Sequence, residues 1–137
     1  MTFASSQFTP TQWDTADDKV TFAKHFVRFV QSQFAAKHFT DKFYRRLSNT
    51  FGHIARYNRA GFWSTFFTTT ADTVRFLEQT LHHPCYGDPA WTYSDVERAL
   101  QEWLQADGTL DRYRQRLVEE TEAAERAELA RLQQKYA

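Results

Sequence analysis

The chain has 137 residues, of which 17% are aromatic and only four are glycine, and its 17 basic and 17 acidic side chains cancel. This length suits one domain, and the single cysteine excludes an intrachain disulfide. No run of about 18 apolar residues occurs and residues 1–7 lack a secretory-signal pattern, so we expect a soluble, cytoplasmic protein without a membrane contact.

The neutral total hides an uneven distribution of charge. Residues 1–18 carry three acids and no base, whereas residues 19–59 carry nine bases and one acid. Residues 60–137 carry eight bases and thirteen acids. The chain therefore has a basic segment and an acidic tail, and this asymmetry is more informative than the total charge.

The first elements are an arm and a long amphipathic helix. Residues 1–12 are expected to form a flexible arm, with Phe3 and Phe8 tucked onto a single helical domain at 13–137. Apolar residues then recur with helical spacing over 16–36, which predicts a helix with a wide buried face.

A second helix is predicted to begin after Thr40, a favourable N-cap, and to end at Gly52. The following stretch, 53–67, is apolar almost all round and is predicted to be the central, buried helix. A strand over 62–69 is the alternative, but no partner strand exists elsewhere in the sequence.

Three further helices complete the pattern. Thr69 or Thr70 is expected to cap a helix over 71–82. Ser94 and Glu97 have the spacing of a capping box at the start of a helix that runs to about 106. The last helix, predicted over 110–135, loses its apolar stripe toward its end and is expected to project from the body.

The fold class that follows is all-α: a single compact bundle of about six helices with a long, partly projecting C-terminal helix.

Two groups of residues are candidates for partner binding. The first lies on the outer sides of the first two helices, and the second combines arginine and tryptophan, which are frequent at binding hot spots. The candidate residues are Lys24, Arg28, Lys42, Arg45, Arg46, Arg56, Arg59 and Trp63. A basic surface of this kind attracts nucleic acid, a nucleoprotein complex or an acidic protein. The alternative is a solvated surface that balances the acidic tail, with cation–π pairs that only stabilise the fold.

Chemistry of other kinds has weak support. His82, His83 and Cys85 are residue types that bind zinc, but adjacent histidines on a helix point about 100° apart. A Cys85 nucleophile with His83 as its base lacks a recognisable orienting acid. Phosphate loops, nucleotide fingerprints and other catalytic motifs are absent from the sequence.

The sequence therefore predicts a non-enzymatic binding protein of the adaptor or inhibitor type, without a metal or cofactor. Its basic face would dock on a polyanionic macromolecule. The second hypothesis is a self-associating protein that forms a homodimer through residues 110–137. The third is a small metal-dependent enzyme at His82, His83 and Cys85.

Overall fold

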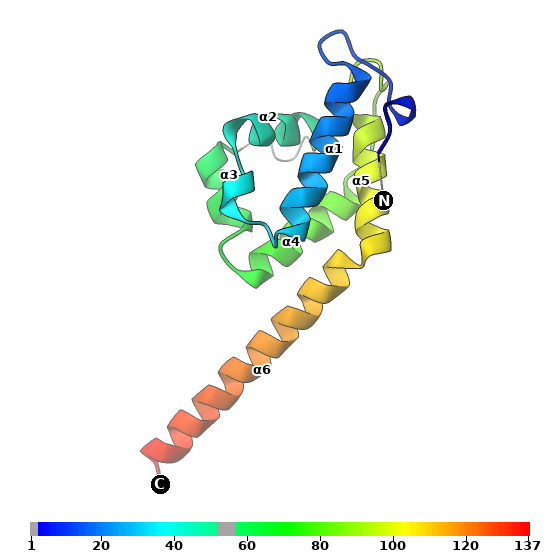
Figure 1. Cartoon of the computed structure of the whole chain (residues 1–137). Coiled ribbons are helices and arrows are strands. Elements are labelled where there is room, and N and C mark those ends of the chain that lie inside the picture. Colours follow the sequence, from blue (N-terminus) through cyan, green and yellow to red (C-terminus); the bar gives the residue numbers. More distant parts are fainter. Residues whose placement is uncertain (1–2, 52–56) are drawn as a thin grey trace.

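The computed structural model describes residues 3–51 and 57–137, and within these ranges every regular element is helical (Figure 1). The all-α class is confirmed. The elements are the short 3-10 turns η1 (Ser5–Gln7) and η2 (Ala36–His38) and the helices α1 (Ala16–Gln31), α2 (Asp41–Thr50), α3 (Arg59–Phe66), α4 (Thr70–His82), α5 (Ser94–Asp107) and α6 (Thr109–Lys135).

Polar N-caps fix the starts of four helices. The side chains of Thr15, Thr40, Asn58 and Thr69 each accept a hydrogen bond from a backbone N–H in the first turn of α1, α2, α3 and α4. Each cap satisfies an N–H that has no partner within the helix. The predicted starts at residues 16, 41 and 70–71 are confirmed because these caps are local features of the sequence.

Helix α1 forms the centre of the core, between α2 and α5 (Figure 1). The ring of Phe29 lies 5.3 Å from that of Phe43 on α2 and 5.3 Å from that of Phe67 beyond α3. Burying each such ring stabilises the fold by about 1.5–3 kcal/mol. The buried apolar residues of α1 are Val20, Phe22, Ala23, Phe26, Phe29 and Val30.

Helix α1 ends at Gln31, five residues before the predicted end. Gln33 and Phe34 take the left-handed conformation, with φ of 60° and 58°. The Phe34 N–H donates to the Phe29 carbonyl over 2.9 Å and closes the helix end. Phe34 is buried although it lies beyond the helix. Its apolar side chain therefore fitted the helical spacing in the sequence and led to a predicted end that is too late.

The predicted central helix over 53–67 is too long in the structure. Helix α3 begins at Arg59 because Asn58 accepts from Gly61 N and caps it; residues 53–56, like the predicted end at Gly52, lie outside the described residues. Phe62 and Phe66 are buried, but Arg59 and Ala60 are exposed. The helix is therefore peripheral rather than central, and the alternative strand over 62–69 is wrong.

The predicted capping box at Ser94 and Glu97 is also wrong. Tyr93 is the N-cap of α5 and makes no side-chain cap. The Ser94 hydroxyl donates instead to the Gly87 carbonyl over 3.0 Å. Glu97 is buried and lies beside His83 at the end of α4, so its side chain serves a tertiary contact.

The two ends of the chain behave differently. Phe3 and Phe8 pack into the core as expected, with their rings 6.3 Å apart. Helix α6 starts after Gly108, whose φ of 69° bends the chain between α5 and α6, and packs first along α4. Its second half projects from the body (Figure 1). No helix in the described part of the chain is long and apolar enough to cross a membrane.

Candidate binding surface

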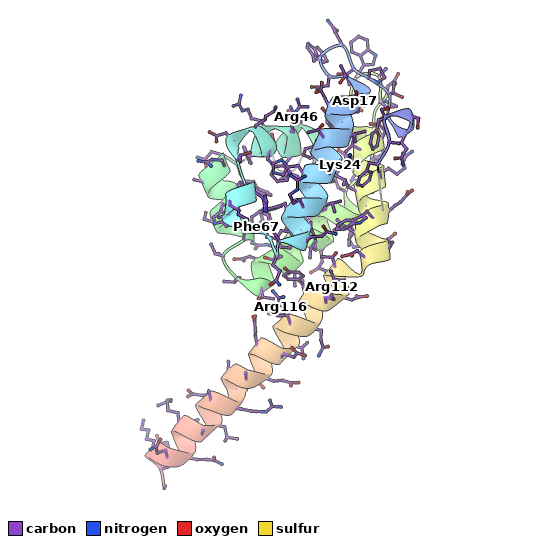
Figure 2. All side chains as sticks on the ribbon, in the orientation of Figure 1. Asp17, Lys24, Arg46, Phe67, Arg112 and Arg116 are labelled. Atoms are coloured by element: carbon purple, nitrogen blue, oxygen red, sulfur yellow. The ribbon has the colours of Figure 1, made fainter. Side chains whose placement is uncertain are left out.

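The outer sides of α1 and α2 carry exposed cations. Because the apolar residues of both helices face the core, their polar residues face solvent. Lys24 and Arg28 lie one turn apart on α1, and Lys42 and Arg45 lie on α2; all four are exposed. We call these four residues the basic face. Figure 2 shows Lys24 on the body of the molecule, away from the projecting part of α6.

Two adjoining hollows are lined by residues of α2. One lies between α1 and α2 and has a volume of about 130 Å³; the other, of about 420 Å³, lies toward the start of α5, at Tyr93. Lys42 and Arg46 line both hollows, so the two hollows adjoin, whereas Lys24 and Arg28 line neither. The other lining residues on α1 and α2 are Asp18, Thr21, Phe22, His25, Thr40, Phe43, Arg45 and Asn49, joined by Asp14 and Tyr93.

His25 forms the apolar wall of the first hollow. Its ring stacks on Phe43 with centroids 4.3 Å apart, and Nε2 donates to the His38 carbonyl over 2.8 Å. Burial lowers the pKa of His25, and the charge of Arg28 lowers it further, against the opposing effect of the His38 carbonyl. His25 is therefore a structural side chain, and its burial favours the neutral form.

Arg46 differs from the other cations because it is held within the fold. It is half-buried, and its Nη1 donates to Asp14 Oδ1 over 3.0 Å and to Tyr93 Oη over 2.6 Å. Burial raises the pKa of Tyr93, so the phenol stays neutral. Arg46 thus supports the floor of the second hollow while Asp14 neutralises much of its charge.

Arg59 and Trp63 lie at a separate hollow, which they line with Ala36, Phe39 and Ala60. Arg59 Nε is 2.7 Å from Asp41 Oδ1. Trp63 is half-buried, with its ring 5.2 Å from that of Phe39. This hollow shares no lining residue with the two hollows beside α2. Arg59 and Trp63 therefore do not extend the basic face. Arg56 lies outside the described residues.

Folding therefore reduces the excess of positive charge. The acidic start of the chain reaches the basic segment: Asp14 pairs with Arg46, and Asp18 lies on the rim of the first hollow. A backbone hydrogen bond from Thr15 lowers the pKa of Asp18, which stays ionised. Among the described residues, none of the four cations of the basic face forms an ion pair with a carboxylate.

Two exposed tryptophans were not among the sequence-based candidates. Trp13 and Trp91 are 71% and 61% exposed, and their rings meet edge to face with centroids 6.3 Å apart. Each lies within two residues of a group that holds Arg46, namely Asp14 and Tyr93. They come from two loops far apart in the sequence, so helical periodicity gives no signal for the pair.

The histidine and cysteine cluster does not form a metal centre. His82 is exposed and its Nδ1 bonds the Glu78 carbonyl of the same helix. Cys85 donates to Gln101 Oε1 over 3.1 Å, and burial raises the pKa of its thiol. Within the described ranges, no three His, Cys, Asp or Glu side chains are grouped to hold a metal ion. A thiol with a raised pKa is also a poor nucleophile.

The described residues form a small all-α protein with a basic face on α1 and α2. Searches of protein-family models, of curated proteins and of solved structures find no match for this chain.

Proposed function

We propose that this protein is a non-enzymatic binding module, of the adaptor or inhibitor type, that docks on a polyanionic partner through the basic face. The partner class is nucleic acid or a nucleoprotein complex. The observation that supports the proposal is the set of four exposed cations, Lys24, Arg28, Lys42 and Arg45, which come from two adjoining helices and have no carboxylate partner among the described residues.

The expected binding is electrostatic and moderate. A protein that neutralises phosphates releases bound counterions, so its affinity falls as salt rises. Four phosphate contacts correspond to a slope of log K against log salt of about −3 to −4. The rim carboxylate of Asp18 opposes a continuous phosphate chain across the hollow, which favours a partner that presents its anionic groups at intervals.

A cytoplasmic setting belongs to the same proposal. Cys85 is a free thiol, which suits a reducing compartment where nucleic acids and their complexes are accessible.

The test is fluorescence anisotropy with labelled single-stranded and double-stranded oligonucleotides over a salt series. One variant combines Lys24→Glu, Arg28→Glu, Lys42→Glu and Arg45→Glu. A second variant combines Arg98→Glu, Arg114→Glu, Arg126→Glu and Arg131→Glu, which reverses four exposed charges elsewhere and serves as the control for net charge.

The proposal expects the first variant to lose binding, whereas the second keeps most of it. Binding by the first variant at the level of the unchanged protein would overturn the proposal, as would failure of the unchanged protein to bind at low salt. Binding to polyglutamate but not to the oligonucleotides would replace nucleic acid by an acidic protein as the partner class.

A further inference from the structure

The second half of α6 is a helix without a neighbour. Leu110 and Tyr113 are buried against the body, but every residue from 118 to 137 is exposed. Figure 1 shows this part extending away from the other helices. Because isolated helices of this length are marginal in water, a packing partner would stabilise it.

Four large apolar side chains remain uncovered on this segment. Val118, Leu129, Leu132 and Tyr136 are 49%, 56%, 37% and 75% exposed. At 100° per residue they fall within an arc of about 60° on the helix. We call them the distal stripe. An apolar arc this narrow is typical of a seam between two helices rather than of a face against a globular core.

The distal stripe is not a continuation of the surface that docks α6 on the body. Leu110, Tyr113 and Leu117 form that docking surface, and their arc lies about 100° around the helix from the stripe. The stripe follows its own spacing: its four residues occupy four positions of the series 118, 122, 125, 129, 132 and 136, and Glu122 and Glu125 occupy the other two. These intervals alternate between four and three residues, which is the heptad pattern of a coiled coil.

Ion pairs along the segment do not cover this seam. Arg126 lies 3.5 Å from Glu122 and Arg131 lies 2.6 Å from Glu128. Such exposed pairs stabilise a helix by a few tenths of a kcal/mol each. They help to keep the helix formed, but they leave Leu129 and Leu132 in contact with water.

We infer that the distal stripe is a self-association surface whose occupant is the same stripe of a second copy of this chain, in antiparallel orientation. A parallel pair in register would place the seam acids Glu122 and Glu125 against themselves, which is unfavourable. An antiparallel pair centred between Leu129 and Leu132 avoids this repulsion because Glu125 then faces Tyr136. This pair joins residues 125–136 of the two copies, and Val118 lies outside the contact. It also brings Glu128 of each copy beside Lys135 of the other, as complementary flanking charges do in coiled coils.

This inference is independent of the basic face, which lies on α1 and α2. Light scattering after size-exclusion chromatography over a concentration series measures the mass directly. The unchanged protein is expected to approach twice the monomer mass of 16.2 kDa as its concentration rises.

Leu129→Glu with Leu132→Glu is expected to raise the dimer dissociation constant by roughly 100-fold or more. The matched control, Ala123→Glu with Ala127→Glu, adds the same charges on the opposite side of the helix and keeps the dimer. Circular dichroism confirms that the body stays folded. A monomer at all concentrations, or equal effects of the two double variants, would overturn the inference.

Orientation has its own test. Glu128→Lys and Lys135→Glu are each expected to weaken the dimer, and the two changes together are expected to restore it. Additive weakening in the double variant would exclude the antiparallel arrangement.

Discussion

The ammonium group of Lys19 lies 2.9 Å from Asp95 Oδ1, and the lysine side chain is fully buried. Its Nζ also donates to the carbonyls of Pro89 and Thr92 over 2.9 and 3.0 Å. The same carboxyl accepts from Thr9 N over 3.0 Å. One lysine thus ties α1 to the start of α5, to the loop before it and, through Asp95, to the N-terminal segment.

Replacing this lysine is expected to destabilise the protein strongly. Lys19→Met leaves the Asp95 carboxylate without its cation and removes the Nζ donor from the carbonyls of Pro89 and Thr92, at an expected cost of about 3–5 kcal/mol in the free energy of unfolding. Urea unfolding followed by circular dichroism measures it. Lys24→Met, an exposed change on the same helix, is the control and should alter stability by less than about 0.5 kcal/mol. A similar small effect for both variants would contradict the role of Lys19.

A glycine at position 33 is expected to stabilise the protein. Gln33 is exposed and has a φ of 60°, a conformation that costs a residue with a Cβ about 1–2 kcal/mol. Gln33→Gly removes this cost, so the free energy of unfolding should rise by about 1 kcal/mol. Gln31→Gly, at the end of α1, should lower it by up to about 1 kcal/mol. The prediction fails if both substitutions change stability in the same direction.

Glu97 is expected to make stability depend on pH. Burial raises its pKa from 4.5 to about 7, so between these pH values the folded protein keeps a proton that the unfolded chain releases. The contribution of Glu97 to stability is therefore complete below pH 4.5 and is lost as pH rises through 7, by about 3 kcal/mol at most. Burial also lowers the pKa of the neighbouring His83, which opposes this trend near pH 6.

The comparison of Glu97→Gln with the unchanged protein isolates this carboxyl from the other titrating groups. Thermal unfolding should show the variant gaining stability relative to the unchanged protein between pH 5 and pH 8. Glu102→Gln, an exposed change on the same helix, should show a constant difference. A constant difference for Glu97→Gln as well would mean that its carboxyl titrates normally.

Removing the carboxylate of Asp14, which forms an ion pair with Arg46, is expected to strengthen polyanion binding. Asp14→Asn frees one guanidinium at the second hollow, so affinity for an oligonucleotide should rise and the salt slope should steepen by about 0.7–0.9. Anisotropy over a salt series measures both quantities. Asp111→Asn, on the exposed side of α6, makes the same change in net charge and should have little effect. Equal effects of the two variants would place Arg46 outside the binding surface.

The sequence predicted what depends on near neighbours in the chain. Caps such as Thr40 and Thr69 act within a few residues and are visible as patterns. The left-handed turn at Gln33 was missed because the ring of Phe34 fits either a helix or the turn that replaces it.

The candidate site depended on contacts between distant residues. The basic segment was evident in the sequence, but its effective charge was not, because Asp14 reaches Arg46 and Lys19 reaches Asp95 only in the folded chain. Lys19 counted as part of the basic segment and proved to be buried. Glu97 matched a local capping motif, and only the position of α4 makes it a buried acid instead.

The length of α6 would also set the distance between the two binding surfaces of a dimer. Its 27 residues span about 40 Å at 1.5 Å per residue, and a helix is stiff over that distance. Two copies joined along the distal stripe would hold two basic faces at a fixed spacing. Such a bivalent molecule gains avidity only from a target whose anionic sites match that spacing. The dimer would then bind extended or repeating targets more tightly than short ones.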